Sequence, residues 1–306
     1  MKILADRRRT ISCILAWLSV LCVAPVTAFG QTTEHYPATI VFMTDFGTLD
    51  DAVPICKGVM YSVMPNVRVV DLSHQVNPFS ILDGARYLEG ATPYYPAGTV
   101  FVVVVDPGVG STRKAVIIKS KRGQYFVLPD NGLITMVADR DGLEGARQIT
   151  NTKWMYGKAL SSTFHGRDIF SPAGAHLARG DNWIDAGPEV DLKALVRLDL
   201  EPVKVDEHGL RGSIIATDGP FGNLISNVSV DDFMKLGYQR GQTVPISIGD
   251  TKLELPFVNT FSDVAVNKPL IYIDSRGFFG LAVNQASFSA AYGIKPPAKL
   301  MIPPAK

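Results

Sequence analysis

Cysteine is scarce in this 306-residue chain, which has three, two of them within the first 22 residues. Cys13 and Cys22 lie in an apolar stretch over residues 11–26, which follows a basic segment and precedes several small residues. This order predicts a secretory signal peptide over residues 1–31. Its removal leaves Cys56 as the single thiol, which excludes an internal disulfide and a cysteine-rich metal site.

The N-terminal apolar stretch is too short for a comfortable membrane span and contains Pro25. Cleavage is therefore favoured over a retained anchor, which stays the alternative. We expect the mature chain to be periplasmic or secreted and to have no membrane contact.

An excess of charge is also absent. The formal net charge is +1, and loss of Lys2, three arginines and Asp6 with the signal peptide changes it to −2. A nucleic-acid-binding domain carries a clear basic excess. The sequence therefore argues against nucleic acid as a partner.

Motifs for covalent and metal catalysis are missing as well. No serine lies in a G-x-S-x-G turn, and Cys56 falls inside a predicted helix, so an acyl-enzyme mechanism lacks its nucleophile. The histidines form neither H-x-x-x-H nor H-E-x-x-H. Asp71 and His74, three residues apart, are interpreted as the end of a strand, with a metal site as the less favoured alternative. Direct displacement by water is the simplest chemistry left.

The chain divides into two patterns. Apolar strand-like runs at 40–43, 67–72, 100–105, 115–118 and 125–128 alternate with helical spacing at 51–64, 81–94 and 171–179. This alternation predicts an N-terminal α/β domain, residues 32–201, with a mainly parallel sheet. Short runs between glycine turns at 209–218, 243–248, 252–257, 270–273 and 279–283, and a last strand near the end, predict a small C-terminal all-β barrel domain, residues 202–306.

Two polar segments of the first domain stand out. Asp106 follows a buried strand and begins a Pro-Gly-Val-Gly turn that leads to Arg113, and His165 lies between Phe164 and Gly166. Ligands of open α/β sheets bind beyond the carboxyl ends of strands, where glycines let the backbone approach them. The imidazole titrates near neutral pH, as catalysis requires. An ordinary turn at Asp106 and a hydrogen-bonded loop histidine remain the alternatives.

Further candidates follow the same logic. Asp45 ends the first strand, where a carboxylate suits two ribose hydroxyls, while Asp50 or Asp51 is interpreted as a helix cap. In the second domain, tight turns carry side chains that can stack on a base, read an amide-like edge or bind a carboxylate. These are Phe221, Asn223, Ser275 and Arg276, with Asp218 beside them. Incidental turn polarity is the alternative for each.

Six motifs taken together resemble the S-adenosyl-L-methionine hydrolase (adenosine-forming) family, whose halide-using relatives are fluorinase and chlorinase. They lie, in the family's order, at residues 44–47, 106–113, 129–132, 163–168, 218–223 and 275–277. The resemblance implies an α/β domain followed by a β-barrel, a homotrimer with ligand between neighbouring subunits, and hydrolysis of S-adenosylmethionine without metal or cofactor.

The resemblance also implies residue roles. Asp106, Arg113 and His165 would orient and activate water; halogenases have Tyr at the position of Asp106 and Ser at that of Gly166, so the chain resembles the water-using branch. The resemblance further implies that Asp45 binds the ribose and that Phe79 packs on the nucleoside. Phe221 and Asn223 would hold adenine, and the backbone near Val283 and Gln285 would contact the adenine edge. Asp218, Ser275 and Arg276 would contact the methionine end.

The chain departs from the halogenases at Ala52 and Val283, which replace Ser and Arg. The signal peptide is a second departure, because S-adenosylmethionine is a cytoplasmic metabolite. An exported nucleoside-binding protein without turnover is therefore the rival hypothesis, and a metal-dependent hydrolase is a third.

Overall fold

The computed structural model describes residues 36–157 and 159–305. The expected signal peptide lies outside this range. Among the described residues, none of the helices has the length and apolarity needed to cross a membrane.

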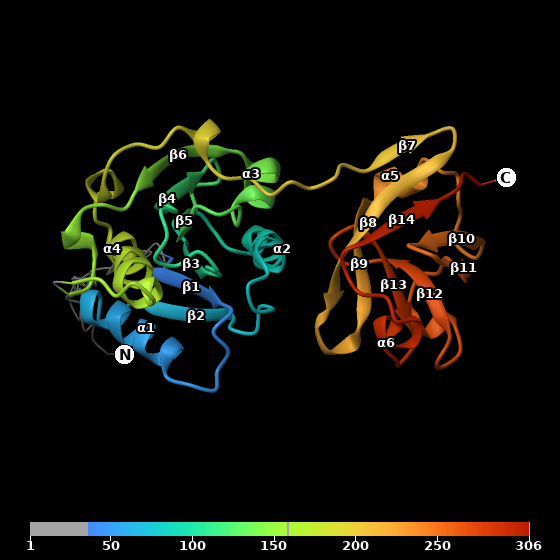
Figure 1. Cartoon of the computed structure of the whole chain (residues 1–306), viewed down its shortest axis with the longest axis horizontal. Coiled ribbons are helices and arrows are strands. Elements are labelled where there is room, and N and C mark those ends of the chain that lie inside the picture. Colours follow the sequence, from blue (N-terminus) through green and yellow to red (C-terminus); the bar gives the residue numbers. More distant parts are fainter. Residues whose placement is uncertain (1–35, 158, 306) are drawn as a thin grey trace, which may run out of the picture. The chain divides into compact units, whose positions relative to one another are not determined.

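A six-stranded mixed sheet forms the centre of the N-terminal part (Figure 1). Its strands, in the spatial order β2-β1-β3-β5-β4-β6, are Arg68–Ser73, Thr39–Thr44, Val100–Val104, Tyr125–Pro129, Ala115–Ser120 and Leu143–Gln148. The first four pair in parallel, and β4 is antiparallel to both of its neighbours. The prediction of a mainly parallel sheet is confirmed.

Helices cover both faces of this sheet. Helices α1 (Ala52–Val63) and α4 (Ser171–Arg179) pack on the face that receives Ile40 and Phe42, whereas Val41 and Met43 point to the opposite face. That second face is covered by α2 (Ile81–Ala91) and α3 (Thr135–Asp141), which contact each other. Apolar residues on both faces explain why β1 and β3 are buried along their whole length.

The C-terminal part is an antiparallel sheet that curls into a nearly closed barrel. Its path β11-β10-β14-β8-β9-β13-β12 joins Thr251–Pro256, Thr243–Ile248, Ala298–Ile302, Gly209–Asp218, Asn223–Ser229, Phe278–Val283 and Pro269–Ile273, with β7 (Lys204–Asp206) beside β8. The N–H of Val258, just after β11, donates to the carbonyl of Ile271 in β12 at 3.0 Å, which brings the two ends of the path together. The predicted barrel is confirmed.

The structure departs from the predicted elements in three places. The expected helix 81–94 ends at Ala91 and continues as a 3₁₀ turn, because Pro93 has no N–H to donate to a carbonyl of the preceding turn. Strand β9 was not predicted, since its sequence alternates weakly. Helix α3 and strand β6 were also missed, and they are joined by Gly142 alone.

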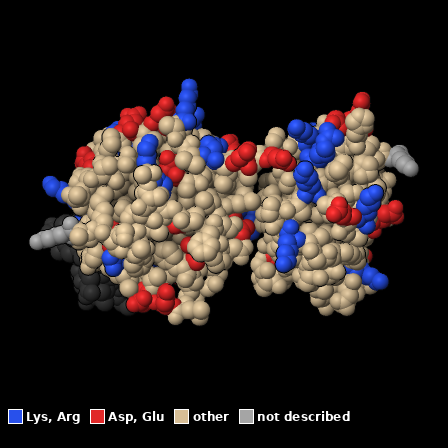
Figure 2. All heavy atoms as spheres, in the orientation of Figure 1, with Lys and Arg blue, Asp and Glu red and all other residues tan. Residues whose placement is uncertain are grey.

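Charged side chains of both signs are mixed over the face of the molecule seen in Figure 2. A single-sign surface of the kind that binds nucleic acid does not appear on that face. The small barrel also carries two short helices, α5 (Val230–Met234) and α6 (Phe288–Tyr292).

Candidate active site

A cavity of about 260 Å³ opens at the carboxyl ends of β1 and β3. Asp45 follows β1 directly, Asp106 lies two residues beyond β3, and His165 precedes the π-helical turn Gly166–Phe170. The remaining wall is mainly apolar and consists of Phe46, Pro78, Phe79, Val104, Val109, Thr163, Phe164 and Gly166. Polar groups thus converge on a small apolar cavity at the edge of the sheet where α/β proteins bind ligands.

Asp106 and Arg113 form a nearly buried ion pair at this cavity. The Nε of Arg113 lies 3.0 Å from both carboxylate oxygens of Asp106, and Nη2 also donates to Oδ2. The two side chains are 4% and 10% exposed, and the guanidinium stacks 5.2 Å from the ring centre of Phe170. The pair is therefore held rigidly, with a charge-assisted fork.

Arg113 connects Asp106 to His165. Its Nη2 lies 2.7 Å from Nδ1 of His165, and a guanidinium can only donate, so Nδ1 accepts and the neutral ring carries its proton on Nε2. Burial and the charge of Arg113 lower the pKa of His165 below its ordinary value. The structure thus brings the three residues into contact and keeps the imidazole neutral at pH 7.

Gly166 has little space beside it. A Cβ at this position would lie 3.0 Å from the ring of Phe46 and 3.5 Å from the sulfur of Cys56, which is fully buried in α1. Phe46 packs edge-on against Phe164 at 6.0 Å. A larger residue at position 166 would require Phe46 to move.

Asp45 accepts a hydrogen bond from Phe79, a residue with a strained backbone. Its Oδ2 accepts a hydrogen bond of 2.9 Å from the N–H of Phe79, whose φ of +67° is in the left-handed region. The ring of Phe79 remains 74% exposed at the rim of the cavity. Such strain in a residue with a large side chain accumulates at functional sites.

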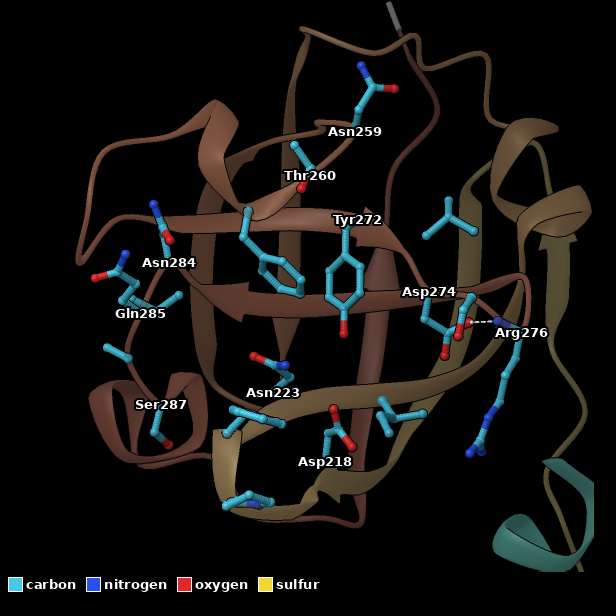
Figure 3. A pocket seen from close by; sticks show the side chains of 18 of the residues that line it. Asp218, Asn223, Asn259, Thr260, Tyr272, Asp274, Arg276, Asn284, Gln285 and Ser287 are labelled. Carbon is cyan, nitrogen blue, oxygen red and sulfur yellow. Dashed lines mark hydrogen bonds between the residues drawn. The ribbon is translucent and has the colours of Figure 1, made fainter. Parts of the chain in front are cut away.

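A second, larger cavity of about 860 Å³ lies in the barrel domain (Figure 3). Residues of the β8–β9 turn, the β12–β13 turn and the segment after β13 line it, including Asp218, Phe221, Asn223, Ser275, Arg276, Val283 and Gln285. Asn223 is 6% exposed, and its side-chain amide lies at this cavity. An amide in that position can both donate to and accept from a polar ligand.

Tyr272 and Asp274 also line this cavity; Asp274 belongs to the turn that the sequence singled out with Ser275 and Arg276, whereas Tyr272 was missed. Burial, with added repulsion from Asp218 and Asp274, raises the pKa of Tyr272 to about 12, so its hydroxyl is a donor at every physiological pH. Gly280 is needed here, because a Cβ would lie 2.8 Å from the tyrosine ring. Tyr272 lies within the apolar run of β12, so the sequence did not mark it as a cavity residue.

Two family models match the chain: the SAM hydroxide adenosyltransferase N-terminal domain over residues 40–187 and the corresponding C-terminal domain over residues 212–301. The chain belongs to this family. An (R)-S-adenosyl-L-methionine hydrolase of Salinispora tropica is 37% identical over 86% of this chain and 97% of its own length. A fluorinase of an Actinoplanes species is 34% identical over 84% of this chain and 94% of its own length. The resemblance read from the six motifs is confirmed.

A solved structure of an uncharacterized conserved protein from Thermotoga maritima shares the fold of this SAM hydroxide adenosyltransferase family member. It superimposes with a TM-score of 0.82 at 35% sequence identity, and the match covers 86% of this chain and 99% of the other. The enzyme family and the fold, an α/β part followed by a barrel, are therefore shown.

The residues predicted for the site fall into two groups in the structure. Asp45, Phe79, Asp106, His165 and Gly166 line the first cavity, with Arg113 behind them, and the remaining predicted residues line the barrel cavity. The two groups share no lining residue. Asp51 occupies the N-cap position of α1 but its side chain makes no capping hydrogen bond, whereas Asp50 accepts a hydrogen bond of 3.1 Å from the N–H of Ala52, the first residue of the helix. No cluster of metal-ligating side chains occurs in the described part of the chain.

Proposed function

We propose that this family member hydrolyses S-adenosyl-L-methionine to adenosine and L-methionine. Water forms a bond to C5′ as the bond from C5′ to sulfur breaks, and the electron pair stays on sulfur as the neutral thioether of methionine. One proton of the water is released. The sulfonium needs no protonation to leave, so catalysis requires an aligned nucleophile and a restrained substrate.

The contact of Asp106, Arg113 and His165 is the observation that carries this proposal. Arg113 uses both oxygens of Asp106, yet a carboxylate has about four lone-pair sites, so Oδ1 can still accept from a water in the cavity. The positive charge of Arg113 favours hydroxide-like character on that water. The triad thereby orients the water, and the proton that the water loses passes to Oδ1 of Asp106 and from there to the solvent.

Water is favoured over halide by the space around Gly166. Halide-using relatives resemble one another in having Ser at this position, and a side chain there would crowd Phe46. Asp106 likewise occupies the position of their Tyr. The nucleophile pocket of this chain therefore has no room for a side chain at position 166 unless Phe46 moves, and it presents a carboxylate that can accept a hydrogen bond from water, whereas a halide ion has no hydrogen to donate.

The substrate would extend over both cavities. Asp45 would bind the ribose hydroxyls and Phe79 would cover the nucleoside, while Phe221 and Asn223 would hold adenine. The backbone near Val283 and Gln285 would contact the adenine edge. Asp218, Ser275 and Arg276 would bind the methionine end. We propose a homotrimer in which the two cavities of one active site come from neighbouring subunits.

Export to the periplasm or the medium is proposed from the N-terminal segment alone. The expected measurement is a mature N-terminus near residue 32 in the cell-free or periplasmic fraction, read by mass spectrometry. Recovery of the intact segment in the cytoplasm would contradict export.

The pH dependence of turnover follows from the neutral imidazole. Protonated His165 would direct an N–H at the donor Nη2 of Arg113 and break the triad. Because burial and Arg113 lower the pKa of His165, kcat is expected to stay constant from neutral to mildly alkaline pH and to fall only below pH 6.5. A decline that began at or above pH 7 would contradict this environment; a pH-rate profile measures it.

The function is tested with residues 32–306, S-adenosylmethionine, chelator and chloride-free buffer, with chromatography of the products. Equal amounts of adenosine and methionine are expected. Adenosine binding without turnover would favour the rival, an exported nucleoside-binding protein. Activity that disappears with chelator would instead indicate a metal-dependent hydrolase.

A further inference from the structure

His74 is a buried histidine that the reaction does not use. It lies directly after β2, is 5% exposed, and packs edge-on against Phe42 at 5.0 Å between ring centres. A buried imidazole is usually retained for the hydrogen bonds it makes. Its contacts lead to the turn that carries Asp45.

His74 contacts the chain on both sides of Asp45. Its Nδ1 lies 2.9 Å from Oγ1 of Thr44, which in turn accepts the N–H of Phe46 at 3.2 Å. Its backbone carbonyl accepts the N–H of Gly47 at 2.7 Å. Thr44 before Asp45, and Phe46 and Gly47 after it, are thus held by hydrogen bonds that lead to the ring or to the backbone carbonyl of His74.

The far side of the imidazole faces an ion pair. Nε2 lies 3.0 Å from Oδ1 of Asp71, and Lys57 in α1 donates to Oδ2 of Asp71 at 2.6 Å. Partial burial raises the pKa of Asp71, but the contacts from Lys57 and His74 outweigh it, so the pKa lies below its ordinary value. A fixed negative charge therefore orients the ring.

At the other end of this network, Asp45 acts on the left-handed residue Phe79 through the 2.9 Å hydrogen bond to its N–H. A carboxylate that must hold a strained backbone and also receive a ligand tolerates little displacement, since misplacement by about 1 Å can cost about 100-fold. The turn that carries Asp45 must therefore be held in place by the residues packed against it.

We infer that His74 is a positioning residue that fixes the Thr44–Gly47 turn through the Thr44 hydroxyl, so that the carboxylate of Asp45 meets the ribose hydroxyls of the substrate. The inference rests on the proposed function for the identity of the ligand. It gives His74, Thr44 and Asp71 a role in positioning Asp45, in place of the metal site considered for Asp71 and His74.

The test compares five variants by calorimetric titration with adenosine, after each is shown to be folded. His74→Phe keeps the ring packing and Thr44→Val removes the hydroxyl; each is made alone and together with Asp45→Ala, and Asp45→Ala alone is the reference for the two double variants. We expect each single variant to raise the Kd of adenosine about tenfold, and less than about twofold when Asp45 is already alanine, since coupled residues are non-additive. Thr44→Ser, which keeps the hydroxyl, is expected to bind normally.

Thr39→Val is the matched control. Thr39 is fully buried at the opposite end of β1 and donates to the carbonyl of Pro37 at 2.6 Å, so this variant should lose stability while the Kd stays unchanged. 2′,3′-Dideoxyadenosine should bind the wild type and Thr44→Val alike.

Two results would overturn the positioning role: equal weakening with and without Asp45, or unchanged binding in the folded Thr44→Val variant. If His74→Phe does not fold, Thr44→Val decides alone. Failure of the proposed function is distinguishable, because wild-type protein would then bind adenosine with no hydrolysis of S-adenosylmethionine.

Discussion

Replacement of Arg113 by alanine is expected to lower kcat about 1,000-fold, the loss seen when a preorganised charge is removed from an active site. The same change leaves Asp106 buried without its counter-charge, since its side chain is 4% exposed. Breaking a buried pair from one side costs about 3–5 kcal/mol of unfolding free energy. Turnover assays and urea denaturation measure the two effects separately.

The double variant Asp106→Asn with Arg113→Met is the control for this prediction. It removes both charges at similar volume, so it should recover most of the lost stability and none of the activity. An Arg113→Ala variant that is stable and active would show that the ion pair has neither role. Stability regained together with activity would place catalysis elsewhere in the cavity.

Replacement of His165 by alanine is the second large effect, with kcat expected to fall about 100-fold, because Nη2 of Arg113 loses its acceptor and the triad shifts. Adenosine binding should be nearly unchanged, since the proposed ribose and adenine contacts come from other residues. Single-turnover kinetics and calorimetric titration read the two quantities.

His165→Asn is the matched variant, because an amide oxygen can accept from Arg113 as Nδ1 does. It should retain more activity than His165→Ala. The assignment would fail if alanine at position 165 left kcat within about tenfold of the wild type, which is less than proton-transfer groups usually contribute.

The sequence was sufficient for most of the fold because burial on two faces leaves a strong signal. Strands β1 and β3 are continuous apolar runs, and Pro172 marks the start of α4. Strand β9 was missed because its alternating residues include polar Ser226 and Asn227, whose partners lie far along the chain.

The candidate site was predictable where side chains follow strands or glycine turns. The contact between Arg113 and His165 spans 52 residues, and spacing alone cannot show that the two atoms meet. Phe46 was overlooked because a phenylalanine after an aspartate gives no sign that it will cover Gly166. The left-handed backbone of Phe79 was equally invisible, since glycine or asparagine normally marks that conformation.

The burial of Cys56 has a consequence for the lifetime of the protein. Burial raises the pKa of this thiol to about 11, so at neutral pH roughly one molecule in 10,000 carries the reactive thiolate. The sulfur is also fully covered, which keeps oxidants and other thiols away from it. Cys56 should therefore resist peroxide and intermolecular disulfide exchange without a reducing partner.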